Sequence, residues 1–299
     1  MTPHPVLCHH GPSMGGIDLH THTNRSDGTF APAELVELAS RRGLDIVAIT
    51  DHDTMDGIDE AAAAGDALGV EVVPGVELST EYQGASVHVL CYWMDPADEA
   101  LQAELHRLRD ERFRRGELMV ERLHALGYPV SFERVREIAG GAVIVRPHVA
   151  QAMVEAGIVA TEDEAFDRFI GDGGPAHVPK HALHPLDAVS LIRSAGGVSV
   201  LAHPGMWGQQ TSLPDELIEA VAGAGMGGLE ADAGDHTPEQ REHFRELARR
   251  LGLVVTGGSD CHGTRYDPVR LGSVTTEPEQ FEALRALAGR GGAAVRPGG

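Results

Sequence analysis

The chain has 299 residues, 42% of them hydrophobic and only 4% aromatic, and its formal net charge is −21. This length suits one large α/β domain or a domain with an insertion, and this charge excludes a broad basic surface for nucleic acid. No apolar stretch is long enough to span a membrane. Three cysteines without regular spacing predict no disulfide framework and fit a reducing cytoplasm.

The predicted elements begin after residues 1–13, which lack the apolar core of a signal peptide and are expected to be a flexible leader. Beyond them, short apolar runs alternate with stretches of helical periodicity, several of which open with a proline. This alternation predicts a parallel sheet with helices between its strands. Strands are expected near residues 17–20, 45–50, 70–73, 86–91, 197–202, 228–230 and 253–257, and helices over 31–42, 58–68, 185–194, 214–224 and 238–251.

The alternation is interrupted between about residues 97 and 185. A long, charged, amphipathic helix is expected over 99–126, and only a few residues near Val143 have the character of a strand. We therefore predict a helical insertion over 99–185 that caps the active site of a barrel built from 14–98 and 186–299. Shorter helices are expected in the insertion over 132–139, 149–156 and 163–170.

Metal-ligating residue types stand where the apolar runs end. His20 and His22 are two positions apart at the end of the first run, so both imidazoles can face one metal ion, and Asp27 follows shortly after. An isolated histidine at such a position is usually structural, but here the pattern recurs along the chain. It predicts a metal centre at the carboxyl ends of the strands, which closure of the sheet into a barrel would bring together. The recurring residues are His52, Glu77, His88, His148, His203, Asp260 and His262.

A set of ordered motifs points to a family. The motifs are H-T-H-T-x-x-S-D-G, T-D-H-D-T, P-G-V-E, R-P-H, A-H-P and G-S-D-C-H-G. They resemble the PHP (polymerase and histidinol phosphatase) phosphoesterases over essentially residues 16–275. The insertion, with R-P-H-V-A followed by A-F-D-R-F-I, resembles the branch that removes the 3′-phosphate of 3′,5′-bisphosphonucleotides or trims RNA and oligonucleotides from the 5′ end. The resemblance implies an α/β fold, a distorted seven-stranded β/α barrel that carries two to three divalent metal ions.

The resemblance also implies a reaction and a ligand set. A hydroxide that bridges two metals would attack the phosphate of a nucleotide, with Glu77 as the bridging carboxylate and Asp260 beside it at the catalytic centre. Mixed imidazole and carboxylate ligands suit Mn, Fe or Zn. One metal would be held by His20, His22, Glu77 and Asp260, a second by Glu77, His88 and His148, and a third by Asp27, His52 and His262.

Further residues are predicted to handle the substrate or to support the ligands. His203 is the leading general acid for the leaving oxygen, and a role as a ligand or phosphate binder is the open alternative. Arg146 and Lys180 are the best cations for a phosphate that is not transferred, because arginine can grip phosphate with two hydrogen bonds. For Arg146 the alternative is a surface ion pair. Asp51 and Asp53 flank His52 and are expected to accept hydrogen bonds from ligand imidazoles.

Other functions stay open at this point. A small-metabolite phosphatase of the histidinol-phosphatase type would use the same metals, although the long insertion and Arg146 count against it. A non-catalytic metal-binding module is disfavoured because every expected ligand is present. Amidohydrolase-type C–N hydrolysis is disfavoured because no lysine stands at a strand end for carbamylation. The expected partner is a phosphorylated nucleotide or a short oligonucleotide, with no membrane involved.

Overall fold

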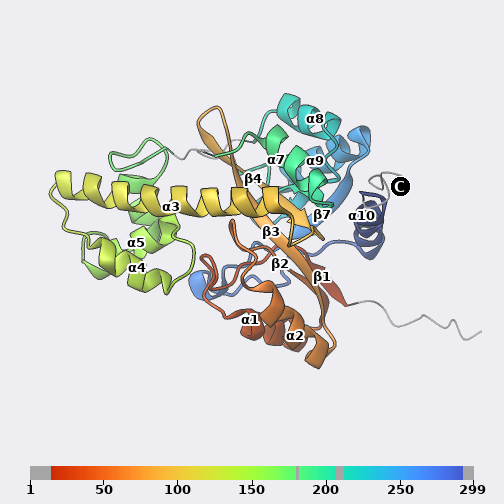
Figure 1. The fold of residues 1–299 in the computed structure, drawn as a ribbon, viewed down its shortest axis with the longest axis horizontal. Coiled ribbons are helices and arrows are strands. Elements are labelled where there is room, and N and C mark those ends of the chain that lie inside the picture. Colours follow the sequence, from red (N-terminus) through yellow and green to blue (C-terminus); the bar gives the residue numbers. More distant parts are fainter. Residues whose placement is uncertain (1–14, 180–181, 207–211, 292–299) are drawn as a thin grey trace, which may run out of the picture.

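The computed structural model describes residues 15–179, 182–206 and 212–291 (Figure 1). The expected leader, residues 1–13, lies outside the described residues, and so does Lys180. Within the described part of the chain, no helix is both long and apolar enough to cross a membrane.

Seven strands form one sheet, and their order in the sheet is their order in the sequence. All seven overlap the predicted runs, but β3 continues nine residues beyond its predicted end and β6 three. Their bounds are β1 Gly16–Asp18, β2 Leu44–Ile49, β3 Glu71–Tyr82, β4 Ala85–Tyr92, β5 Val198–Leu201, β6 Gly228–Ala233 and β7 Val254–Gly258.

The sheet is not parallel throughout, and this corrects the prediction. The pairs β1–β2, β2–β3, β5–β6 and β6–β7 are parallel, but β4 runs antiparallel to both of its neighbours. The reason is local, because only Gln83 and Gly84 connect β3 to β4, and both have positive φ (51° and 81°). A connection this short makes a hairpin, whereas a parallel pair needs a long crossover.

The two ends of the sheet approach each other. Thr21, just beyond β1, forms a parallel bridge with Cys261, just beyond β7. The N–H of His22 donates to the carbonyl of Cys261 at 2.9 Å, and the N–H of Ser259 donates to the buried carboxylate of Asp18 at 2.9 Å. The sheet is therefore a nearly closed, distorted barrel, as the resemblance implies.

Helices cover the outside of the barrel. Pro32, Pro185 and Pro238 each open one of them, where the missing N–H costs nothing and the fixed φ favours the helix. One helix, α10, was not predicted, and it buries Phe281 and Leu284 against Ile17 and Val73 of the barrel. The bounds are α1 Pro32–Arg41, α2 Ile58–Leu68, α7 Pro185–Ser194, α8 Asp215–Gly223, α9 Pro238–Leu251 and α10 Pro278–Gly291.

In its described residues, 93–179 and 182–184, the segment between β4 and α7 contains helices and no strand, so the suggestion of a strand near Val143 is wrong. Here the N–H of Val143 donates to the carbonyl of Arg25 in a loop contact, not in a ladder. The elements are α3 Glu99–Ala125, α4 Phe132–Ala139, α5 Arg146–Glu155, α6 Glu162–Ala165 and a π-helical turn over Phe166–Ile170.

The long helix α3 connects two hydrophobic cores, and Figure 1 shows it running from the barrel to α4 and α5. Its first half buries Leu101 and Leu105 in the core around the barrel. Its second half buries Met119 and Leu123 in a separate core with residues of α4 and α5. The helical segment therefore has a core of its own beside the barrel. The domain boundaries at 99 and 185 stay a prediction.

Candidate metal centre

Most of the predicted ligands gather at one end of the barrel. His20 and His22 follow β1, His52 follows β2, and Asp260 and His262 follow β7. Because parallel strands of a barrel finish at the same face, these short connections place their side chains together.

Glu77 and His88 reach the same place from inside longer strands, not from strand ends as predicted. The hairpin of β3 and β4 extends well past the end of β2, and His52 forms a parallel bridge with Glu77. In the hairpin, Ser79 lies opposite His88. The middle of the hairpin is therefore level with the ends of the shorter strands.

The ligand atoms lie close together. The Nε2 atoms of His20 and His22 are 3.2 Å apart. His22 Nε2 is also 3.2 Å from Glu77 Oε2 and 3.2 Å from Asp260 Oδ1. On the other side of Glu77, His88 Nδ1 is 2.9 Å from Oε1. Distances of this kind are expected when side chains surround a common cation.

Four overlapping groups have donor atoms that all lie within 4.8 Å of one another, a distance that would let them share a metal ion. Glu77 belongs to two of them, which fits the bridging role predicted for it. The groups are His22, Asp27, His52 and His262; His20, Glu77 and His203; His20, His22 and Asp260; and His52, Glu77 and His88.

His148 is the predicted ligand that the structure does not bring to Glu77 and His88. Among the described residues it belongs to none of the four groups. It stands in the first turn of α5, where its Nδ1 accepts a hydrogen bond from the N–H of Val145 at 3.3 Å. Burial lowers the pKa of His148 to about 4. The place that we expected His148 to take at Glu77 is occupied by His203, whose Nε2 is 3.2 Å from Glu77 Oε1.

Two buried atoms at the middle of the cluster indicate that a cation fits there. His52 Nδ1 and Glu77 Oε2 are 3.0 Å apart, yet neither makes a hydrogen bond within the described part of the chain. Leaving a buried polar atom without a partner costs about 1–3 kcal/mol. Both atoms would be satisfied as ligands of one ion, and imidazole with carboxylate is a donor set that suits a transition metal.

The charges of the cluster lead to the same conclusion. Burial raises the pKa of Glu77. The charges of His52, His88 and His20 outweigh burial and hold this pKa well below its usual range. Conversely, Asp260 and Glu77 outweigh burial and raise the pKa of His22 to about 10. The carboxylates therefore attract positive charge strongly, and divalent ions could supply it in place of imidazole protons.

Glu230 supports the cluster and was not identified from the sequence. It is buried on β6, where Oε1 lies 3.0 Å from Nδ1 of His20 and Oε2 accepts a hydrogen bond from the N–H of His203 at 2.8 Å. A carboxylate behind a ligand imidazole fixes its orientation and tautomer. The signal was present in the sequence, since Glu230 stands in the predicted strand 228–230, like the ligands in the other runs.

Glu230→Gln is expected to weaken metal binding by about 10-fold to 100-fold, because the amide can accept from only one of the two donors that the carboxylate serves. A competition titration with a coloured chelator measures the affinity. Glu246→Gln, on the exposed face of α9, is the matched control and should bind metal as the parent protein does. Unchanged affinity in Glu230→Gln would contradict its role in orienting His20.

Among the described residues, the hydrogen bonds found for Asp51 and Asp53 come from backbone, hydroxyl and guanidinium groups and not from imidazoles, which corrects the prediction for both. Asp51 accepts hydrogen bonds from Thr23 (2.8 and 2.6 Å) and from Ser26 (2.6 Å) in the loop that carries Asp27. Asp53 accepts from the N–H and hydroxyl of Ser79, each at 2.7 Å, and from Arg112 at 2.5 Å. They hold the ligand-bearing backbone in place.

The backbone is strained at this end of the barrel. Asp53, His203 and Asp260 have φ of 54°, 27° and 49°, although none is glycine. Such conformations cost about 1–3 kcal/mol each and cluster at functional sites. The strain and the buried ligands together mark this face of the barrel as the functional site.

The predicted phosphate binder Arg146 lies at the start of α5, beside two arginines of α3. Arg112, Arg115 and Arg146 border one small hollow. Arg146 pairs with Asp172 at 2.8 Å, and Arg115 donates to the carbonyl of Val178 at 2.7 Å. Burial together with the nearby Arg146 and Arg112 lowers the pKa of Arg115 to about 9. Among the described residues, no carboxylate forms an ion pair with Arg115.

The metal cluster opens to solvent through a cavity of about 190 Å³. His203 lines this cavity and is partly accessible, whereas His20 and His22 are fully buried. Tyr266 forms part of its wall and stacks against the guanidinium of Arg270, 3.7 Å from the ring centroid. A substrate can therefore reach the ligand atoms from this side.

The fold and the site place this protein in the class of metal-binding β/α barrels. Comparison with known proteins identifies the family. The family model described as PHP domain matches residues 18–137. The chain is 35% identical over 250 residues to a 3′,5′-nucleoside bisphosphate phosphatase of Chromobacterium violaceum, covering 83% of this chain and 88% of that protein. It is 33% identical over 246 residues to a 5′-3′ exoribonuclease of Haemophilus influenzae, covering 82% and 89%.

The fold is also shared with solved structures. One, described as a metal-dependent phosphoesterase from Bifidobacterium adolescentis, superposes with a TM-score of 0.86 at 35% identity, over 93% of this chain and 98% of that one. This chain belongs to the PHP domain family. It is a hydrolase that acts on phosphoric ester bonds.

Proposed function

We propose that this phosphoesterase acts on nucleotides, removing the 3′-phosphate of 3′,5′-bisphosphonucleotides and trimming short RNA or oligonucleotides from the 5′ end. The observation that carries the proposal is the convergence of four potential metal-binding groups around Glu77 and its neighbours. The similarity to a bisphosphate phosphatase and an exoribonuclease supports the choice of substrate.

Two to three divalent ions, Mn, Fe or Zn, would be held by the four groups. When bound, such ions lower the pKa of water toward about 7 and neutralise the phosphoryl oxygens. Glu77 would be shared between neighbouring ions. Asp260, His20 and His22 would be ligands of one ion. His203 faces the cavity from the other side of Glu77, where it can reach the leaving oxygen.

The arginines beside α5 would hold the phosphate that is not transferred. Arg112, Arg115 and Arg146 border one hollow of about 10 Å³, so these side chains would have to move apart to admit a phosphate. Arg115 has no ion pair with a carboxylate in the described part of the chain. A phosphate that took the place of Asp172 beside Arg146 would accept charge-assisted hydrogen bonds from Arg115 and Arg146. Arg112 also donates to Asp53, which follows β2, and to Ser79 on β3. These hydrogen bonds connect the three arginines to the part of the barrel that carries the metal ligands.

Arg146→Ala is expected to raise KM for a bisphosphonucleotide by about 10-fold or more, the effect of losing a charged hydrogen bond. A simple monoester should be affected much less. Steady-state kinetics on both substrates measure the difference, and Arg134→Ala is the control, since Arg134 forms surface ion pairs with Glu155 and Glu137. Equal effects on the two substrates would mean that Arg146 serves the reacting phosphate or is only structural.

A substrate panel tests the proposal. The protein, reconstituted separately with Mn, Fe or Zn, is assayed against 3′,5′-bisphosphoadenosine, 5′-phosphorylated oligonucleotides and histidinol phosphate. We expect hydrolysis of the first two in preference to the third. Preference for histidinol phosphate would favour the small-metabolite phosphatase, and metal binding without hydrolysis of any ester would favour a non-catalytic module.

A further inference from the structure

We infer that a trough beside the metal centre holds the downstream strand of a single-stranded oligonucleotide, with Phe113 as a platform for one of its bases. The trough consists of two adjoining cavities that share Asp56 and the loop 139–142 as walls. The inference rests on the proposed function and deepens it, because it distinguishes an oligonucleotide substrate from a mononucleotide.

The near end of the trough touches the residues around Asp27. Its first cavity, of about 460 Å³, is lined by Ser26, His148 and Arg265. Ser26 Oγ lies 3.3 Å from Asp27 Oδ1, and Arg265 donates to the carbonyl of Asp27 at 2.7 Å. A strand in this cavity would therefore start directly beside the cluster. His148 also lines this cavity, whereas the sequence predicted that it would join Glu77 and His88.

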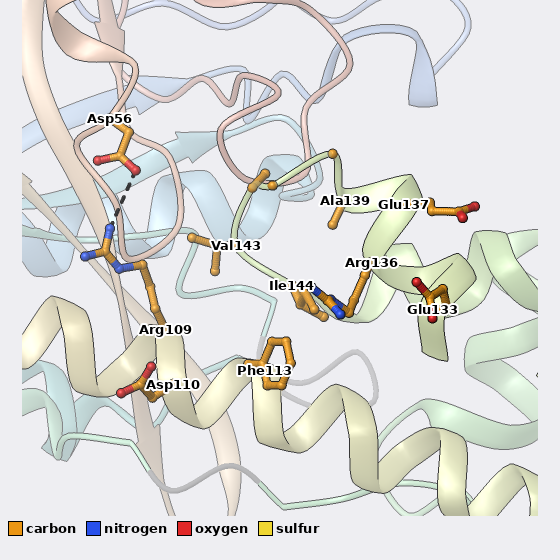
Figure 2. A pocket seen from close by; sticks show the side chains of 13 residues that line it. Asp56, Arg109, Asp110, Phe113, Glu133, Arg136, Glu137, Ala139, Val143 and Ile144 are labelled. Carbon is orange, nitrogen blue, oxygen red and sulfur yellow. Dashed lines mark ion pairs between the residues drawn. The ribbon is translucent and has the colours of Figure 1, made fainter. Parts of the chain in front are cut away.

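The far end of the trough lies between α3 and α4 (Figure 2). This second cavity has a volume of about 630 Å³. Both cavities fall in the range of about 300–1,000 Å³ that small-molecule sites occupy. Each therefore has room for a nucleotide.

Phe113 is an exposed aromatic side chain at this far end. It is 42% exposed, in a chain in which aromatic residues make up only 4%. Phe132 supports its ring edge-on at 5.2 Å, and the guanidinium carbon of Arg136 lies 6.0 Å from its centroid. Figure 2 shows Phe113 and Arg136 together on the wall of the cavity. Exposed aromatic rings with a nearby arginine are the stacking surfaces that single-stranded nucleic acid uses.

The charge of the trough suits a strand held through its bases. The chain as a whole is strongly acidic. Over the whole trough arginines and acidic residues are equal in number, but in the far cavity two arginines stand beside four acidic residues. Arg109 pairs with Asp56 at 3.6 Å, while no ion pair of Arg136 is found in the described part of the chain. Carboxylates can accept from base amino groups and arginine can donate to base carbonyls. Binding here should depend less on salt than binding to a basic groove.

The chemistry of the proposed reaction requires such a site. When a 5′-phosphorylated RNA is trimmed, a water oxygen bonds to phosphorus and the P–O3′ bond breaks. The 3′-oxygen leaves with the first nucleotide and takes a proton, and the phosphate stays on the downstream strand. The strand must therefore lie apart from the first nucleotide. The trough shares no lining residue with the mouth cavity, where His203 stands.

Two variants test the trough without touching the metal ligands. Phe113→Ala removes the platform, and Ala142→Trp fills the wall that both cavities share. Leu118→Ala and Arg114→Ala are matched controls, because both residues are exposed on α3 and line neither cavity. A cooperative thermal unfolding transition, close to that of the parent protein, shows that each variant is folded.

The first readout is the fluorescence anisotropy of a labelled, 5′-phosphorylated RNA of about ten nucleotides, with metal-depleted protein. Each trough variant should weaken RNA binding by about 10-fold, the effect of losing one base stack, and the controls should not. The second readout is KM with metal present, which should rise about 10-fold more for the RNA than for 3′,5′-bisphosphoadenosine. A DNA strand of the same sequence shows whether the 2′-hydroxyl contributes.

Equal RNA binding by all folded variants would overturn the inference, and so would equal increases of KM for the RNA and the bisphosphonucleotide. The failure of the proposed function looks different. In that case 3′,5′-bisphosphoadenosine is not hydrolysed, while the anisotropy still separates the trough variants from the controls.

Discussion

Glu77→Gln is expected to lower kcat on a bisphosphonucleotide at least about 10³-fold, which corresponds to about 4 kcal/mol of transition-state stabilisation. Glu77 is buried, contributes to two of the four potential metal-binding groups and lies within 3.5 Å of nitrogen atoms of His20, His22, His52, His88 and His203. The amide keeps the shape of the side chain but loses the charge that holds two cations close together. Steady-state kinetics and elemental analysis of protein purified without chelator measure the two effects.

The control for this variant is Glu71→Gln, on the same strand. Glu71 is exposed and forms an ion pair with Arg285 at 2.6 Å, so its loss should change neither activity nor metal content. The parent protein should carry two to three equivalents of transition metal. Less than one equivalent in fully active parent protein would reject the proposed metal cluster.

His203→Asn is expected to slow hydrolysis of a nucleoside phosphate by about 10²-fold or more, the typical contribution of a general acid. His203 lines the mouth cavity with its side chain 17% exposed, so it can reach a leaving oxygen that the fully buried His20 and His22 cannot. Hydrolysis of p-nitrophenyl phosphate should be slowed far less, because that leaving group needs little protonation. Metal content should stay unchanged.

The same variant distinguishes the acid from a ligand. His203 Nε2 is 3.2 Å from Glu77 Oε1, and His203 shares a potential metal-binding group with His20 and Glu77. If His203→Asn loses a metal equivalent, His203 is a ligand. If it slows both esters alike with metal retained, it binds phosphate, and the acid must be another residue.

Local pattern was sufficient to locate the strands and most of the helices. Short apolar runs predict strands, and apolar residues at helical spacing predict helices, because both signals depend on residues close in the sequence. The bounds of α2, α4, α7 and α9 agree with the prediction. The unpredicted α10 is the exception. It opens with Pro278 and places Phe281, Leu284 and Ala288 at helical spacing, so the local signal was present and was overlooked beside the Gly/Ala-rich end of the chain.

The sequence by itself determined the residue types of the metal centre, since His, Asp and Glu stand at or near the ends of successive apolar runs. The pattern alone did not determine which of them meet, and the predicted ligand sets came from the family resemblance. That depends on strand direction and register, so the antiparallel β4 decides where His88 points, and the long β3 decides that Glu77 reaches the cluster from mid-strand.

Contacts over long sequence separations decided the remainder. His20 and Glu230 are 210 positions apart, and only the closing of the barrel places one behind the other. His148 follows a short apolar run, but its position in the first turn of α5 directs it to the trough instead of Glu77. A residue type and its place in an apolar run are local properties, whereas a ligand set is a property of surfaces that come together only when the chain folds.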